Sequence, residues 1–312
     1  MVKKKFDIGP YLYLLPALVI IIVFRLVPIL FAFVLSFREW SINGAGAFIG
    51  FENYKKLLAD PIFWQSMLNT FYLVIFVVPL SLFLSLVFAN FLNSITKLRA
   101  FFRTVYYIPT VTSMVAVSIV WKMMYSKETG LMNYLLGLIG IDPLGWLGES
   151  KGIFQLMFGE ALPAWAGGPS LALFSIIILT VWKGLGYNTI IYLAGLQNIP
   201  ETYYEAASLD GANKFTKFFK ITLPLVSPTT FYVLMMTTIT TFQVFSQIYL
   251  MTGPGPTTGG PLGTTKVIVY YLFEQGYDNN NYGYASAIAL VLFFTILSLT
   301  LFQRRLEKKV HY

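Results

Sequence analysis

Long apolar runs separated by short polar segments dominate the chain. A bilayer core about 30 Å thick requires about 20 helical residues to cross it. Runs of that length occur at 11–37, 66–92, 101–125, 171–196, 223–251 and 284–302. Several runs contain proline or glycine, which membrane helices tolerate where neighbouring helices satisfy the freed backbone groups. The pattern therefore predicts an all-α polytopic membrane protein of six transmembrane helices.

The composition supports this fold class and argues against several kinds of site. Of the 312 residues, 56% are hydrophobic and 12% are charged, whereas soluble domains carry about 25% charged residues. The chain has no cysteine, and its one histidine, His311, lies at the C-terminal end. Thiolate and histidine-based sites are therefore not expected. We predict neither catalytic nor metal-binding residues.

Lys and Arg cluster at the ends of the apolar runs, which argues against a nucleic-acid partner despite the formal net charge of +8. With the N-terminus inside, the inner segments hold more cations than the longer outer loops, as membrane topology requires. The inner cations are Lys3, Lys4, Lys5, Lys97, Arg99, Arg103, Lys214, Lys217, Lys220, Arg304, Arg305, Lys308 and Lys309. The outer cations are Arg38, Lys55, Lys56, Lys122, Lys127, Lys151 and Lys266. Both termini are therefore predicted to be cytoplasmic.

This orientation divides the chain into a cytoplasmic N-terminus (1–10), a transmembrane domain (11–304) and a cytoplasmic C-terminus (305–312). The predicted external loops are 38–65, 126–170 and 252–283, and a cytoplasmic loop at 200–222 joins the fourth and fifth spans. The first run lacks a small-residue cleavage site, so we expect a retained span rather than a signal peptide.

Two cations, Arg25 and Lys183, fall inside the first and fourth runs. A charge at the middle of the bilayer costs about 2.5–3.5 kcal/mol on insertion scales, so each side chain is expected to face protein or water. One interpretation is a snorkelling cation or one paired within the bundle. The other is a cation near a translocation path.

The cytoplasmic loop reads as two short helices joined by a turn. Pro200 can open a helix over Glu201–Leu209, with Glu201 and Glu205 near its positive end. Asp210 and the glycine after it end that helix, and Asp210 is expected to cap a second helix at 212–221. Such a unit either carries force into the bundle or lies at the lipid interface.

The order of residues in this loop resembles a known family. The run Glu205-Ala206-Ala207-Ser208-Leu209-Asp210-Gly211-Ala212, followed by Phe215, Ile221-Thr222-Leu223-Pro224 and Pro228, resembles the "EAA" loop of binding-protein-dependent ABC importer permeases. Further similarities include Gly50-Phe51-Glu52-Asn53-Tyr54, Gly130-Leu131-Met132-Asn133 and Tyr282-Gly283-Tyr284-Ala285-Ser286-Ala287, so the resemblance covers nearly the whole chain. The subtype resembles the first permease of maltose- and glycerol-phosphate-type carbohydrate systems.

The resemblance implies a type I ABC importer permease fold with a cytoplasmic coupling helix, in the plasma membrane of a bacterium. It implies four partners besides the lipid bilayer: a second, homologous permease subunit, two ATP-binding subunits and an extracytoplasmic solute-binding protein. ATP and Mg would bind the partner subunits, with no cofactor on this chain. The residues expected at the contact with the ATP-binding subunit are Glu201, Glu205, Ala206, Ala207, Asp210 and Gly211. The turn requires a residue that tolerates positive φ, which explains a glycine at 211.

The fifth run is unusually polar. It contains Thr237, Thr238, Thr240, Thr241, Gln243, Ser246 and Gln247. Helical spacing allows one face to present hydroxyls and amides, which a sugar requires, but Ser, Thr and Gln also bond helices to one another in membranes. By this resemblance and polarity, the expected substrate path comprises Gly184, Tyr187, Asn188, Thr237, Thr241, Gln243 and Gln247.

Other functions fit the residues less well. The chain has no Gly-x-x-x-x-Gly-Lys-[Ser/Thr] loop, so it is not expected to hydrolyse ATP itself. An amino-acid or peptide permease shares the loop motif but not the sugar-type external motifs. A membrane enzyme or proton-coupled transporter would require acidic or histidine residues that the spans lack. If Lys183 faces the path, an anionic sugar such as a uronide oligomer or a sugar phosphate becomes the alternative substrate.

Overall fold

The computed structural model of the chain describes residues 9–42, 44–95, 99–159, 162–163, 166–253 and 259–307. The described residues form helices almost throughout, together with one short two-stranded sheet. Most of the predicted cytoplasmic tails, with His311, lie outside the described residues. The chain divides into two compact units, residues 1–60 with 272–294 and residues 61–271 with 295–312, and each is described by itself.

The first unit joins the N-terminal helices to a small cap, which is formed by a short β-hairpin and the helix that follows it. Its elements are α1 (Gly9–Ile21), η1 (Ile22–Leu26), α2 (Val27–Leu35), β1 (Arg38–Ser41), β2 (Gly44–Phe48), α3 (Glu52–Ala59), η5 (Glu274–Asp278) and the start of α16 (Tyr282–Leu306). The antiparallel hairpin of β1 and β2 was not predicted, and its turn depends on Gly44 at φ +99°. Asn53 ties the cap together by donating to the carbonyls of Ser36 (2.9 Å) and Arg38 (3.1 Å).

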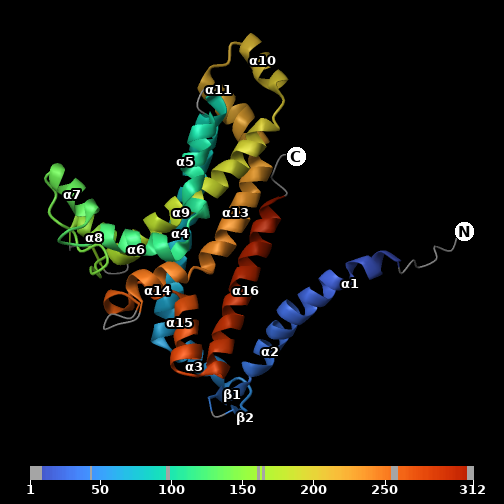
Figure 1. Ribbon diagram of the computed structural model, residues 1–312, viewed down its shortest axis with the longest axis vertical. Helices are drawn as coiled ribbons and strands as arrows, with labels where there is room; N and C mark the ends of the chain where they lie inside the picture. Colours follow the sequence, from blue (N-terminus) through green and yellow to red (C-terminus); the bar gives the residue numbers. More distant parts are fainter. Residues whose placement is uncertain are drawn as a thin grey trace, which may run out of the picture. The chain divides into compact units, whose positions relative to one another are not determined.

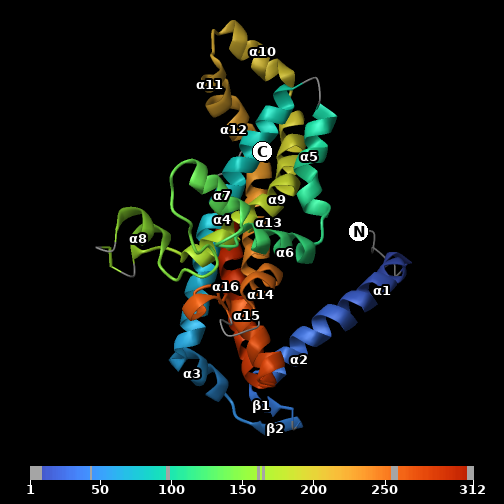
Figure 2. The same ribbon diagram turned by 60° about the vertical axis from the view of Figure 1, so that its left-hand side comes forward.

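The second unit holds the larger helical bundle (Figures 1 and 2). Its long helices are α4 (Pro61–Ser94), α5 (Arg99–Val111), α9 (Leu171–Gln197) and α13 (Ser227–Phe242). The shorter ones are α6 (Met114–Met124), α7 (Leu131–Leu138), α8 (Ile153–Phe158), α10 (Glu201–Leu209), α11 (Lys214–Lys217), η3 (Phe218–Thr222), α12 (Leu223–Leu225), α14 (Ser246–Thr252), η4 (Pro261–Gly263) and α15 (Ile268–Phe273). Helix α9 packs against α4, α5 and α13, so it forms the centre of this unit.

Two apolar clusters hold this bundle together. One surrounds Leu173, Ile176 and Ile177 of α9, and the other surrounds Tyr192 and Leu193 nearer the end of the same helix. All five side chains are buried. The core therefore runs along α9, and the cavity-lining residues described below interrupt an otherwise apolar helix surface.

The six-span prediction holds when two bent helix pairs each count as one span. Four helical segments are long and apolar enough to cross a bilayer alone: Tyr13–Leu35, Pro61–Ser94, Leu171–Gln197 and Tyr282–Arg305. The other two spans of the described chain are the pairs Ala100–Val111 with Met114–Met124, bent by 96°, and Lys214–Leu225 with Ser227–Phe242, bent by 63°.

The third and fifth predicted runs are each interrupted in the structure. The third run breaks at Thr112 and Ser113, where Ser113 takes a ψ of 133° that no helix accommodates. Within the fifth run, helix α13 ends at Phe242 and helix α14 begins only at Ser246. Polar residues stand at both breaks, at Thr112 and Ser113 and at Gln243, but isolated polar residues in an apolar run do not by themselves predict a break.

Candidate functional site

The loop between α9 and α13, which was predicted to be cytoplasmic, begins with the helix that the sequence predicts. Helix α10 spans Glu201–Leu209. It follows Pro200, whose ψ of 134° is not helical and separates α10 from the helix before it. Figures 1 and 2 show α10 and α11 at one end of the second unit, beyond the ends of α5 and α9. Of the residues expected to contact a partner, Glu201, Glu205, Ala206, Asp210 and Gly211 are exposed, and Ala207 is half-buried.

A Schellman turn closes α10 and requires its glycine. The Ala212 amide donates to the Ala207 carbonyl (2.8 Å) and the Gly211 amide to the Ser208 carbonyl (3.1 Å), which is the hydrogen-bond pair of that motif. Gly211 sits at φ +76°, so the expectation of a positive φ at this residue is confirmed.

The residue that caps the second helix of the loop differs from the prediction. Asp210 is the C-terminal cap residue of α10 and makes no capping bond to the next helix. The Asn213 side chain caps α11 instead, accepting from the Thr216 amide at 2.8 Å. The reason is distance along the chain, because a capping side chain reaches the amide two or three residues ahead, and Asp210 lies too far upstream.

Side chains fasten the two arms of the loop to each other. The hydroxyls of Tyr204 and Thr222 are 2.9 Å apart, and the Lys217 ammonium donates to the Ser208 hydroxyl. Both bonds join α10 to the segment that re-enters the bundle. The loop is therefore a braced helical hairpin rather than a freely moving connection.

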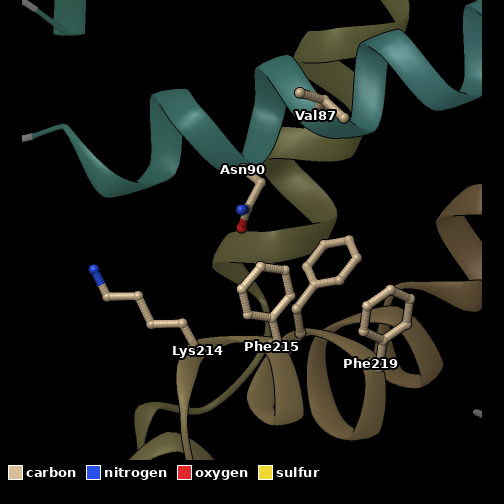
Figure 3. A pocket seen from close by; sticks show the side chains of 6 residues that line it. Val87, Asn90, Lys214, Phe215 and Phe219 are labelled. Atoms are coloured by element: carbon tan, nitrogen blue, oxygen red, sulfur yellow. The ribbon is translucent and has the colours of Figure 1, made fainter.

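A hollow of about 380 Å³ lies beside this hairpin. Figure 3 shows Phe215 and Phe219 rising from the loop toward Val87 and Asn90 of α4, with Lys214 at one side. Phe215 and Phe219 are exposed at 77% and 60%. The aromatic side chains of the loop thus face a mainly apolar recess at the end of α4.

A second cavity, of about 370 Å³ and open on one side, lies next to the break before α6 and the break between α13 and α14. Its lining comes from α6, α9, α13, α14 and the segment between α13 and α14, and it combines a larger apolar area with hydroxyl and amide groups and one cation. The lining residues are Met114, Thr180, Lys183, Gly184, Thr240, Thr241, Gln243, Val244, Phe245, Ser246 and Gln247. We call it the polar cavity.

The polar cavity brings together four of the residues expected along a substrate path. Gly184, Thr241, Gln243 and Gln247 line it, and a side chain added at Gly184 would meet nothing within 4 Å. Gln247 also donates to the Thr180 hydroxyl at 3.3 Å. This part of α13 and α14 thus combines polar groups facing a cavity with one bond between helices.

Three expected path residues do not line this cavity. Asn188 donates to the Thr237 hydroxyl at 3.3 Å, and both side chains are buried. They bond α9 to α13, which is the alternative interpretation that the sequence left open. Tyr187 is 45% exposed and also lies outside the lining.

The two intramembrane cations differ. Lys183 is half-buried, lines the polar cavity and donates to the backbone carbonyls of Pro109, Thr110 and Thr112. Arg25 lies in η1 and is exposed. Lys183 is therefore both bonded within the bundle and placed at a cavity.

Sequence reasoning missed Met114, Thr180, Val244 and Phe245 as lining residues. Thr180 lies four residues before Gly184 on α9, so helical spacing could have placed it on the same face. Met114 reaches the cavity only because the third span breaks immediately before it. The apolar pattern of the third run did not reveal its position.

The family model described as "Binding-protein-dependent transport system inner membrane component" matches residues 10–312. The chain belongs to this family. As a component of such a transport system, it is a multi-pass inner membrane protein, and the resemblance carried by the loop motif is confirmed.

Relatives and a solved structure agree with this family. The transport component is 35% identical over 302 residues to the probable ABC transporter permease protein YurN of Bacillus subtilis, covering 96% of each chain. It is 35% identical over 292 residues to the trehalose/maltose transport system permease protein MalF of Thermococcus litoralis, covering 93% and 90% of the two chains. A crystal structure of a bacterial ABC transporter involved in import of the acidic polysaccharide alginate matches with a TM-score of 0.76 and 25% identity, covering 97% and 96%.

Proposed function

We propose that this chain is one of two homologous permease subunits of an ATP-driven importer for a sugar or oligosaccharide. An extracytoplasmic solute-binding protein delivers the substrate, and two ATP-binding subunits supply the energy from the cytoplasmic side. Both termini face the cytoplasm. ATP and Mg bind the partner subunits, and this chain binds no cofactor and catalyses no reaction.

The observation that carries this proposal is the continuity between the loop and the polar cavity. Helix α9 runs from Gly184 at the cavity to Gln197 and leads directly into α10. The chain then returns through η3, α12 and α13 to Thr241 at the same cavity. In the proposed mechanism, a displacement of α10 is transmitted to both α9 and α13, whose connection through the hairpin can be followed in Figure 1.

This geometry suits alternating access. The braced hairpin of α10 and α11 moves with an ATP-binding subunit, through contacts made by Glu201, Glu205, Ala206, Ala207, Asp210 and Gly211. Because α9 and α13 are stiff helices, rocking of the hairpin changes the separation of the groups that line the cavity. The substrate is held by hydrogen bonds in one state and released in the other, which is a shift of population driven from outside this chain.

The chemistry of the cavity favours a sugar. Thr241, Gln243 and Gln247 supply hydroxyl and amide groups that both donate and accept hydrogen bonds, and Phe245 supplies an aromatic surface. A sugar presents many hydroxyls and apolar ring faces, so it matches such a lining. The names of the trehalose/maltose relative and of the alginate importer support the same substrate class.

An anionic sugar is the second candidate, because Lys183 is a cation in the cavity lining. The two candidates are separable with two probes, maltose and an alginate oligosaccharide. Uptake of the alginate oligosaccharide with no uptake of maltose supports the anionic substrate, and the reverse supports a neutral one.

The test uses the chain assembled with its partner subunits and binding protein in proteoliposomes, with ATP inside. Thr241→Val and Gln243→Leu each remove hydrogen-bonding groups, so the KM for uptake is expected to rise about twofold to tenfold, as about 0.5–1.5 kcal/mol per bond implies. Thr104→Val serves as the matched control, since that hydroxyl donates only to the Ala100 carbonyl on an exposed face of α5.

Assembly with the ATP-binding subunits is expected to be unchanged in all three variants. Unchanged uptake kinetics in Thr241→Val and Gln243→Leu would remove the polar cavity from the substrate path. Uptake by this chain without any ATP-binding subunit would overturn the importer assignment itself.

A further inference from the structure

The Lys183 ammonium does something more specific than line a cavity. It donates to the carbonyls of Pro109, Thr110 (3.3 Å) and Thr112, all of which lie at the end of α5 or just beyond it. These carbonyls flank the point where the third span bends by 96°. One side chain of α9 is therefore bonded to three backbone groups around a break in another helix.

The break explains why those carbonyls need a donor. In a continuing α-helix the carbonyls of Pro109 and Thr110 would accept from the amides four residues ahead, at Ser113 and Met114. The chain turns at Ser113, so these amides point elsewhere. A carbonyl without a donor in the hydrocarbon region costs several kcal/mol. The Thr112 hydroxyl donates to the Pro109 carbonyl at 2.7 Å, and the Lys183 ammonium, which carries three donors, supplies a further donor there and one each to the carbonyls of Thr110 and Thr112.

Glycine at 186 brings Lys183 within reach. Gly186 lies one turn further along α9, on the same face as Lys183. A Cβ built at Gly186 would lie 2.1 Å from the Tyr106 carbonyl oxygen and 2.7 Å from the Thr110 hydroxyl. Helices α9 and α5 are thus in backbone contact at this level, which places the ammonium at the end of α5.

The bend in turn shapes the polar cavity. Met114 is the first residue of α6, directly after the break, and it lines the cavity together with Lys183 and Gly184. If the third span continued straight, α6 would leave this position and the cavity would lose one wall.

We propose that Lys183 is a positioning residue that holds the bend between α5 and α6 and so keeps α6 as a wall of the polar cavity. The bend is a property of the chain alone, whereas the consequence for transport rests on the proposed function. The three donors of the ammonium are taken up by the three carbonyls, so Lys183 acts through α6 rather than by hydrogen bonding to the substrate.

The bend can be measured as a distance in the assembled transporter in lipid. The chain has no native cysteine, so Phe101→Cys and Met123→Cys introduce a single pair of spin labels, at side chains exposed by 61% and 69%. A straight helix would place these positions about 33 Å apart at 1.5 Å per residue. Two arms of about 15–16 Å bent by 96° place them about 21 Å apart.

Lys183→Met keeps the length of the side chain and removes its donors and charge. We expect the label distance to move from about 21 Å toward about 33 Å, or to spread over that range, with a rise in the KM for uptake. Lys183→Arg restores donors and charge, so it is expected to restore both readouts. The matched control is Lys122→Met, which removes an exposed cation from α6 itself.

Each outcome decides the proposal. An unchanged distance in Lys183→Met overturns it, and an unchanged distance combined with loss of alginate-oligosaccharide uptake assigns Lys183 to the substrate instead. If Lys183→Met does not assemble, Gly186→Ala tests the same contact by pushing α9 away from α5. A distance that stays near its original value in that variant also counts against the proposal. Failure of uptake in the parent chain would overturn only the proposed function, since the distance is read without transport.

Discussion

The turn at Gly211 offers a sharp test of the hairpin formed by α10 and α11. At this residue the hairpin requires only a particular backbone conformation. Gly211 takes φ +76°, and a Cβ added to it would meet nothing within 4 Å. Gly211→Ala therefore introduces no clash, removes no side-chain contact and changes no charge. Within this chain, the substitution therefore acts only through the cost of a positive φ.

That cost is about 1–2 kcal/mol for a residue with a Cβ. The Schellman bonds from the amides of Gly211 and Ala212 depend on this conformation, so they weaken together with it. A destabilisation of this size changes an equilibrium about 5- to 30-fold. We expect the equilibrium constant for the docking conformation of the hairpin to fall by that factor. When the concentration of ATP-binding subunit is limiting, the rate of uptake should fall with it.

The assay compares uptake and ATP hydrolysis by the assembled transporter in proteoliposomes, with the binding protein present. Gly211→Ala is expected to lower both, and Gly211→Asn to lower them less, because asparagine tolerates this region of φ. Gly137→Ala is the matched control. It makes the same substitution in equally open surroundings, on α7, where no positive φ is needed.

Equal uptake and hydrolysis in Gly211→Ala and the parent chain would refute the reasoning. So would an equal loss in Gly137→Ala, since that would point to a general effect of the added methyl group. A loss of membrane insertion is not expected, because the turn lies outside the apolar spans.

Three further substitutions test other contacts. Gly186→Ala should destabilise the bundle by about 1–3 kcal/mol through overpacking against α5, whereas Gly184→Ala has open space; thermal unfolding in detergent with a tryptophan signal compares the two. Asn133→Leu leaves the Trp146 indole and three backbone groups without their partner, so proteolysis of the segment 127–146 should accelerate, and equal cleavage rates would contradict this role. Asn213→Ala should cost about 1 kcal/mol as a lost cap and speed amide exchange at Thr216, while Asp210→Ala should not.

The hairpin formed by α10 and α11 could be predicted closely because its information is local. Pro200 and Gly211 fix the two ends of α10 through their own backbone preferences, and neither depends on distant residues. The cap on α11 was misassigned because Asp210 and Asn213 are both good cap residues. The choice depends on where the helix begins, and the structure places that start at Lys214, directly after Asn213.

The polar cavity could be predicted only in part. Thr241 and Gln243 stand out as polar letters in an apolar run, but whether such residues face a cavity or another helix depends on packing. Asn188 and Thr237 satisfy each other at 3.3 Å, which no spacing rule reveals. The break before Met114 was invisible because the carbonyls that it exposes are satisfied by a lysine more than 70 residues away.

The segment 127–146 could also be predicted only in part from the sequence. Asn133 was noticed only as part of a motif. In the structure it uses both amide hydrogens and both lone pairs of its oxygen, on Lys127, Leu144 and Trp146. One buried side chain of α7 thus holds the irregular segments on both sides of that helix.

The direct run of α9 from cavity to hairpin has a consequence for how this transporter can diversify. Each residue inserted into or deleted from the stretch between Gly184 and Gln197 would turn the cavity face by about 100° relative to the hairpin. The number of residues in that stretch is therefore constrained far more tightly than their identity. Point substitutions at Gly184, Thr241 or Gln243 leave this register intact, so under the proposed function substrate choice can change without altering how the hairpin is joined to the cavity.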